Sequence, residues 1–269
     1  YIEGKNIVIE YRYAEGKVDF LRKLAAELVR LNVEIILTAG PGPTRAAKRA
    51  TATIPIVMAQ DTDPVADGFV ANLARPGGNI TGLSTFAPEL GGKRMEILKE
   101  VVPKLATLAV LGNSTFPGNA PALRQMELAA EVIKVRLQYL DVLEPKDIDA
   151  GFRAASEARA DAVLTLTSAI LSTHRTQLIE LAEKNRLPGM YHNSQFVEAG
   201  GLMAYSANLT ELFHRSATYV DKILKGAKPG DLPVEQPTKF ELVINLKAAQ
   251  QIGLTIPPSV LARADNVIK

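Results

Sequence analysis

The feature that most constrains the fold is an alternation of short apolar runs, rich in β-branched residues, with amphipathic helical stretches. The runs begin roughly 20–30 residues apart, the spacing of strand–helix units in a parallel sheet. The predicted strands are Asn6–Tyr11, Val33–Thr38, Ile54–Ala59, Asn79–Thr85, Thr107–Gly112, Leu137–Val142, Ala162–Thr167, Gly189–His192 and Gly201–Tyr205. This pattern predicts an α/β protein with parallel sheets.

Apolar residues at helical spacing predict helices over 21–29 and 65–73, from Asn119, from Thr173, and over Leu209–Lys225. We expect Asn119 to be an N-cap. We expect the last helix to end at Gly226, because glycine tolerates the left-handed conformation that follows many helices.

The strands fall into two groups. The segment 85–92 has the composition of a linker and separates four strands from five, and 226–237 is a second irregular connection. We therefore expect two Rossmann-like α/β lobes joined by a multi-stranded hinge. The first lobe would be 1–86 with roughly 206–229, and the second 87–205 with roughly 230–269. The imbalance of four strands in the first lobe and five in the second indicates either unequal lobes or a strand–helix unit lost before Tyr1.

Composition excludes several functions. The 269 residues contain no cysteine and only three histidines, so disulfides, thiolate catalysis and a His-rich metal centre are not expected. The net charge of +2 comes from interspersed basic and acidic residues, which argues against a nucleic-acid surface. No apolar run is long enough to span a bilayer.

In open parallel sheets, ligands bind beyond the carboxyl ends of the strands. The run Thr38-Ala39-Gly40 leads through two prolines to Thr44 and a helix, whose free N–H groups could bind a carboxylate. The alternative is an ordinary loop with proline in the first helical turn.

The next strand is followed by Asp61 and Asp63. Asp61 could contact a ligand, whereas Asp63 precedes Pro64 and is expected to be an N-cap. An alternative is a Mg²⁺-dependent hydrolase that uses both carboxylates. The third strand places Ser84 at the same edge.

The second lobe offers neutral polar groups and aromatic rings at its strand ends. We expect Asn113, Ser168 and Asn193 to orient a ligand, and Phe116 and Tyr191 to flank it. His192 lacks a third partner for catalysis with Ser194, and no nucleophile, base or metal cluster stands out. The chain is therefore predicted to bind a ligand without being an enzyme and without a cofactor.

Several longer segments carry a family resemblance. They include 2–12, 24–30, 63–65, 74–82, 198–203, 219–226 and 232–237. Across essentially the whole chain they resemble the ABC-transporter substrate-binding family that includes tryptophan- and tyrosine-binding proteins. The resemblance implies a type I periplasmic binding fold with the ligand held between two lobes.

Two departures from the family matter. The strand and helix that precede this motif in the family are absent, as is a signal peptide, and a homodimer could compensate for the first strand. Aromatic-amino-acid-binding members resemble one another in an Asp where this chain has Ser168, so a carboxylate that lacks an amine is comparably expected as ligand.

The resemblance implies the solute-binding component of an ABC importer. It would capture a small carboxylate or an amino-acid-like, aromatic ligand, because binding shifts open lobes toward a closed form. A transporter permease would read the closed form, and the full-length protein would be periplasmic or anchored outside the membrane. The alternatives are the hydrolase and a ligand-sensing regulatory domain. No nucleic-acid partner is expected.

Overall fold

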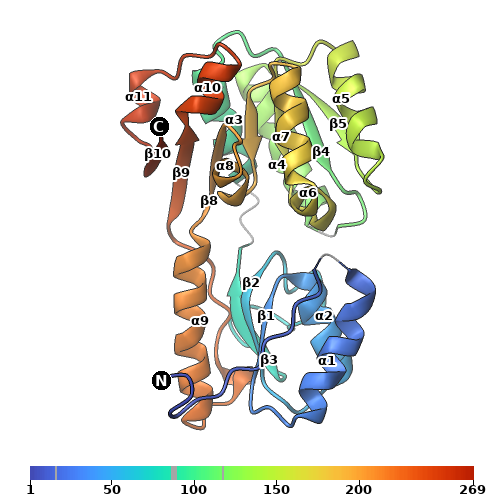
Figure 1. The fold of residues 1–269 in the computed structure, drawn as a ribbon, viewed down its shortest axis with the longest axis vertical. Helices are drawn as coiled ribbons and strands as arrows, with labels where there is room; N and C mark the ends of the chain where they lie inside the picture. The colour runs from blue at the N-terminus through green and yellow to red at the C-terminus, as the bar shows by residue number, and fades with distance from the viewer. Residues whose placement is uncertain (16, 86–89, 117) are drawn as a thin grey trace. The chain divides into compact units, whose positions relative to one another are not determined.

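The computed structural model describes residues 1–15, 17–85, 90–116 and 118–269. The chain packs into two compact units (Figure 1). Unit 1 comprises Tyr1–Thr85 and Leu209–Pro237, and unit 2 comprises Phe86–Asn208 and Thr238–Lys269. The chain therefore passes from one unit to the other after Thr85, Asn208 and Pro237.

Residues 230–237 belong to unit 1, although the sequence assigned them to the second lobe. The reason is main-chain pairing. Val234 N donates to Leu73 O, and Glu235 N donates to Gly82 O while Ser84 N donates to Glu235 O. The expected boundary at residues 86 and 87 lies outside the described residues, and the expected linker ends at Leu90, where a helix begins.

Unit 1 contains a parallel sheet with the strand order β1-β2-β3. Helix α1 packs against α2, and α9 lies along β2 and β3 (Figure 1). One small core joins the three strands with α1 and α2. In chain order the elements of unit 1 are η1 (Val18–Phe20), α1 (Leu21–Arg30), β1 (Ile36–Ala39), α2 (Pro41–Ala50), β2 (Ile56–Asp61), β3 (Ile80–Ser84), α9 (Leu209–Leu224) and η2 (Pro229–Asp231).

The predicted strand Asn6–Tyr11 is wrong. The segment has only an isolated bridge between Glu3 and Ile7, and Val8 and Tyr11 are 79% and 53% exposed. A strand is stabilised by hydrogen bonds and side-chain contacts with a neighbouring strand, and this segment pairs with none among the described residues.

The predicted helix over 65–73 is also wrong, because the segment forms turns. Gly68 has a φ of +67°, outside the helical region, and Phe69 N and Val70 N both donate to Pro64 O. The helical spacing of the apolar residues here reflects burial of Phe69 and Val70 in the core of unit 1. The predicted end of the last helix is confirmed, since Gly226 has a φ of +97°.

Unit 2 contains a seven-stranded sheet with the order β10-β9-β8-β7-β6-β4-β5. Neighbouring strands are parallel except β8 and β9, which are antiparallel. In chain order the elements are α3 (Leu90–Val101), β4 (Thr107–Gly112), α4 (Asn119–Ile133), β5 (Arg136–Asp141), α5 (Asp147–Glu157), β6 (Ala162–Thr165), α6 (Ala169–Thr173), α7 (Arg175–Lys184), β7 (Gly189–Tyr191), α8 (Gln195–Glu198), β8 (Met203–Ala207), β9 (Phe240–Asn245), α10 (Leu246–Gln251), α11 (Pro258–Leu261) and β10 (Asn266–Ile268).

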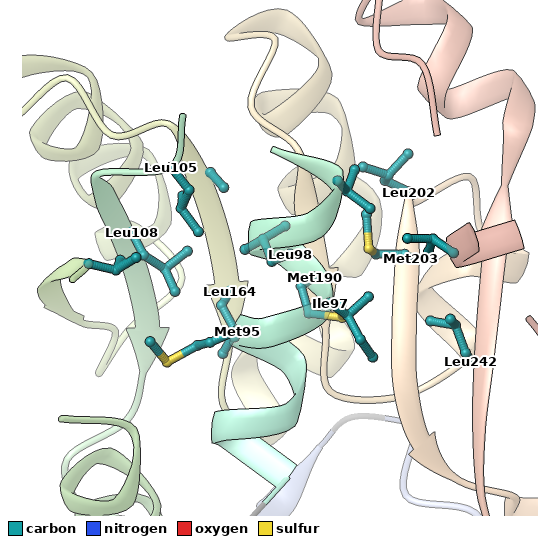
Figure 2. Packing of buried hydrophobic residues seen from close by; sticks show 14 of the residues in the cluster. Met95, Ile97, Leu98, Leu105, Leu108, Leu164, Met190, Leu202, Met203 and Leu242 are labelled. Carbon is teal, nitrogen blue, oxygen red and sulfur yellow. The ribbon is translucent and has the colours of Figure 1, made fainter. Parts of the chain in front are cut away.

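Both faces of this sheet are buried. Val163 and Leu164 are consecutive in β6, yet they belong to different core clusters, because side chains alternate along a strand. Figure 2 shows one cluster, in which Met95, Ile97 and Leu98 of α3 pack with residues of the strands. Fully burying one such side chain stabilises a fold by about 1.5–3 kcal/mol. Among the described residues, none of the helices combines the length and apolarity needed to cross a membrane.

Candidate functional site

In unit 1, the strand ends bring Thr38, Thr44 and Asp61 together. The strands are parallel, so their carboxyl ends share one edge of the sheet. The hydroxyl oxygens of Thr38 and Thr44 are 2.9 Å apart, and Thr44 Oγ1 donates to Gly40 O at 3.0 Å. The Thr44 hydroxyl also lies beside the Asp61 carboxyl.

Asp61 is the buried acid of this edge. It is 1% exposed, its Oδ1 accepts from Thr62 N at 2.9 Å, and its Oδ2 has no hydrogen-bond partner among the described residues. Burial raises the pKa of Asp61 to about 7, and the nearby Asp67 adds to the rise, whereas Thr44 and Thr62 oppose it. A buried carboxyl oxygen without a donor is costly, so this group is suited to receive a donor from a ligand.

The helix that follows β1 offers less to an anion than the sequence prediction assumed. Helix α2 begins after Gly40, and its first and third residues are Pro41 and Pro43, which have no N–H. Thr44 N already donates to Gly40 O. Only the Gly42 N–H remains in the first turn, so this helix terminus cannot supply the several donors expected for a carboxylate.

Two other predicted residues of unit 1 have different environments. Ser84 is buried, and its Oγ donates to Thr62 O at 3.2 Å, which joins the ends of β2 and β3. Ala39 is exposed at the end of β1, where the pairing with β2 shifts register. Ala39 therefore borders the edge, and Ser84 shapes it from within.

In unit 2, three predicted polar residues cap their own loops. Asn113 Oδ1 accepts from Thr115 N, Ser168 Oγ from Leu171 N, and Asn193 Oδ1 from Gln195 N. The Nδ2 groups of Asn113 and Asn193 donate to no acceptor among the described residues. These amides are therefore available as donors. Phe116 is half-buried in the loop after β4.

The sequence prediction missed the role of Asn119. It is the first residue of α4 and not the N-cap, which is Gly118. Its buried Nδ2 donates to Asn113 O at 3.0 Å and to Thr167 O at 3.1 Å, so it joins the loops after β4 and β6. An Asn near a helix start predicts a cap by default, and only the fold shows this second role.

Tyr191 is not placed to flank a ligand at this edge. It is 2% exposed and its ring stacks on Phe196 with centroids 4.8 Å apart. The hydroxyl lies over Gly189, two residues earlier, so the ring runs back toward the amino end of β7. There it lines a small cavity of about 20 Å³. The prediction failed because a strand-end residue can turn its side chain along the strand.

His192 forms no pair with Ser194. Its Nδ1 lies 3.0 Å from Thr165 Oγ1 and its Nε2 lies 3.2 Å from Ser172 Oγ. Burial, and to a lesser degree the charge of Arg94, lower the pKa of His192 to about 3. The ring is therefore neutral at physiological pH and serves as a hydrogen-bonding support within unit 2.

Arg94 is a buried cation that the sequence reasoning overlooked. It lies on the buried face of α3 with Leu90 and Leu98, at intervals of four residues. Its Nε donates to Tyr205 O at 2.8 Å and its Nη2 to His192 O at 3.2 Å. The signal was available, because an Arg at the apolar positions of a helix is unusual.

The acidic residues after β2 do not form a metal-binding set. Asp63 Oδ1 accepts from Ala66 N at 3.0 Å, so it caps a turn and is not the predicted helix N-cap, because residues 64–68 form turns instead of a helix. Across the described ranges, no group of three or more His, Asp or Glu side chains is arranged to hold a metal ion.

The fold and these edges define a class of protein. Two α/β units with largely parallel sheets, connected by three passages of the chain, constitute the type I periplasmic binding fold. Residues 1–268 match the family described as ABC transporter substrate binding protein, and the chain belongs to that family.

Individual relatives agree with this assignment. The tyrosine-binding protein of Clostridioides difficile (strain R20291) is 23% identical over 245 residues, which are 91% of this chain and 70% of the relative. A conserved domain protein from Vibrio cholerae O1 biovar eltor superposes with a TM-score of 0.90 at 30% identity, covering 99% of this chain and 89% of the other. An ABC domain from Streptococcus pneumonia in complex with L-Trp gives the same TM-score and coverage at 25% identity.

Proposed function

We propose that this protein is the solute-binding component of an ABC importer, and that it binds a small carboxylate or an amino-acid-like, aromatic solute outside the cytoplasm. The family and the ligands named for its relatives, tyrosine and L-Trp, support this proposal. The partner would be a transporter permease.

The observation that carries the proposal is Asp61. A buried carboxyl oxygen without a donor persists in a fold only if something compensates for its cost. A ligand ammonium or hydroxyl group would supply the missing donor. Thr38, Gly40, Thr44 and Ser84 would shape this edge around it.

We propose that unit 2 contributes hydrogen-bond donors to the ligand. The free amides of Asn113 and Asn193 would bind its oxygen atoms, and Phe116 would contact an apolar or aromatic body. Ser168 would contribute less, because its hydroxyl oxygen caps α6. Tyr191 is left out because its ring lies in the core.

A thermal-shift and calorimetric screen tests the proposal. The probes are L-tyrosine, L-tryptophan, benzoate and 3-(4-hydroxyphenyl)propionate. A probe at 100 times its Kd should stabilise the protein by about 2.7 kcal/mol. If none of the four raises the unfolding temperature or releases heat on binding, the proposed ligand class is wrong.

The pH dependence separates the two ligand classes. An ammonium group binds the ionised form of Asp61, whose pKa is about 7. Binding of L-tyrosine should therefore tighten between pH 5.5 and pH 8, with release of a proton. 3-(4-Hydroxyphenyl)propionate, which lacks the amine, should not tighten over that range. The matched variants are Asp61→Asn, which should abolish the effect, and Asp63→Asn, which should preserve it.

A further inference from the structure

Unit 2 buries a positive charge for which the described residues provide no counter-charge. Arg94 is 8% exposed, and no described carboxylate lies within ion-pair distance of it. Burial lowers the pKa of its guanidinium to about 10, so the group is still charged at neutral pH. An unpaired buried charge costs several kcal/mol unless something compensates for it.

The two hydrogen bonds of Arg94 do not explain its charge. Nε and Nη2 donate to the main-chain carbonyls of Tyr205 in β8 and His192 just after β7. Both acceptors are neutral, and a neutral donor could satisfy them equally well. The bonds do fix the plane of the guanidinium beside the carboxyl end of β7 and the middle of β8.

The remaining face of the guanidinium is available. Nη1 of Arg94 donates to no acceptor among the described residues. If this atom were also fully buried, it would be a buried polar atom without a partner, and among the described residues only Asp61 Oδ2 and Gln138 Oε1 are such atoms. Nη1 therefore keeps contact with solvent. A guanidinium has five N–H donors in a planar fork that matches a carboxylate. The described residues use two of them.

We propose that Arg94 binds the carboxylate group of the ligand through Nη1 and the free N–H of Nη2. This inference rests on the proposed function and names the residue that recognises the anionic end of the solute. Arg94 takes the anion-binding role that the sequence predicted for the amino terminus of α2. At that terminus, two prolines leave a single free N–H. A charge-assisted pair with a carboxylate would also offset the burial cost of the cation.

The test compares a ligand with its carboxylate-free analogue. Calorimetry measures the Kd of L-tyrosine and of tyramine for the wild type and for Arg94→Met, and benzoate with benzyl alcohol is the parallel pair. The wild type should prefer the carboxylate by about 10- to 100-fold. In Arg94→Met the preference should fall to about 1. A merely structural role would weaken both ligands equally, and an unchanged preference overturns the proposal.

Two controls keep the result interpretable. Arg136→Met removes another guanidinium of unit 2 that donates to a main-chain carbonyl, but at the amino end of β5, and it should leave the preference intact. If Arg94→Met does not fold, Arg94→Gln removes the charge and retains a polar donor. A crystal structure of the wild type with L-tyrosine gives a separate answer. A carboxylate oxygen within hydrogen-bond distance of Nη1 supports the proposal, and a carboxylate bound elsewhere overturns it.

Two different results separate the proposed ligand class from the proposed role of Arg94. If the wild type binds none of these acids, the proposed ligand class and the role of Arg94 are both wrong. If the wild type binds L-tyrosine and Arg94→Met retains its preference over tyramine, only the role of Arg94 is wrong.

Discussion

The two units differ in how completely they bury their apolar residues. Unit 2 covers both faces of its sheet with two core clusters, whereas unit 1 has one small cluster. In unit 2, the large apolar side chains left exposed are Leu128, Val132 and Leu143 among the described residues. Unit 1 exposes many more: Tyr1, Ile2, Val8, Ile9, Tyr11, Tyr13, Phe20, Leu31, Leu37, Val65 and Phe213.

This difference indicates where stability resides. Local stability follows the density of buried apolar contacts, so unit 1 should open at a lower free energy than unit 2. The units also differ in chemistry, since unit 1 places a buried acid at its strand ends and unit 2 places a buried cation and free amides. The less stable unit thus carries the acceptor, and the more stable unit carries the donors.

The largest expected effect separates the two units. Gly82 in β3 has a φ of +130°, and a Cβ there would overlap the main chain of Met58 in β2. Gly82→Ala should destabilise unit 1 on the order of 5 kcal/mol, through backbone strain and overlap. Hydrogen exchange should show unit 1 unprotected while β4, β6 and β7 stay protected. Simultaneous loss of protection in both units would contradict their independence.

The corresponding test of unit 2 is a substitution that creates a cavity in its core. Leu98 of α3 is fully buried beside the strands of unit 2 (Figure 2). Leu98→Ala should cost about 3 kcal/mol in urea-induced unfolding, from lost transfer energy and the cavity left behind. Leu128→Ala, on the exposed part of α4, is the control and should change stability by less than about 0.5 kcal/mol. Equal losses in both variants would show that the core of unit 2 is not packed as described.

A smaller effect tests the acid of unit 1. The pKa of Asp61 is raised, so the folded state holds its proton where the unfolded state has lost it. The stability of the wild type relative to Asp61→Asn should therefore fall as the pH rises from about 4 through 7. The relative loss should be on the order of 2 kcal/mol between pH 5 and pH 6.5. Chemical denaturation of both proteins at each pH measures it, and a pH-independent difference would show that Asp61 ionises normally.

The smallest expected effect concerns the loops of unit 2. Asn119→Ala removes two hydrogen bonds, to Asn113 O and Thr167 O, and should cost about 1–2 kcal/mol. Thermal unfolding measures the loss, with the exposed Asn266→Ala as control. If the two variants unfold at the same temperature, Asn119 does not hold these loops together.

Much of the fold was predictable because it depends on local pattern. Strands β4 to β8 and helices α1, α4 and α9 were expected within a few residues of where they lie, since their apolar spacing matches their burial. Strands β9 and β10 were not predicted. β9 becomes a strand through antiparallel pairing with β8, from Met203↔Ile244 to Ala207↔Phe240, and no local signal announces that pairing.

The candidate site was predictable in part. Asp61 was singled out correctly as an acid at a strand end, because the position of a strand end can be inferred from the apolar run before it. Its burial and the missing partner of Oδ2 could not be inferred. Tyr191 was assigned to the ligand because sequence does not tell which way a strand-end ring turns.

The sequence by itself determined the class of fold, the family and the edges of the sheets where polar groups gather, since these follow from periodicity and from motifs contiguous in the chain. Only the tertiary structure decided which polar groups are buried without a partner. Arg94 meets Tyr205 and His192, residues about a hundred positions away, and Asp61 at the end of β2 lies beside Thr44 of α2. Such contacts depend on how the strands are ordered in each sheet, and that order is set by packing along the whole chain.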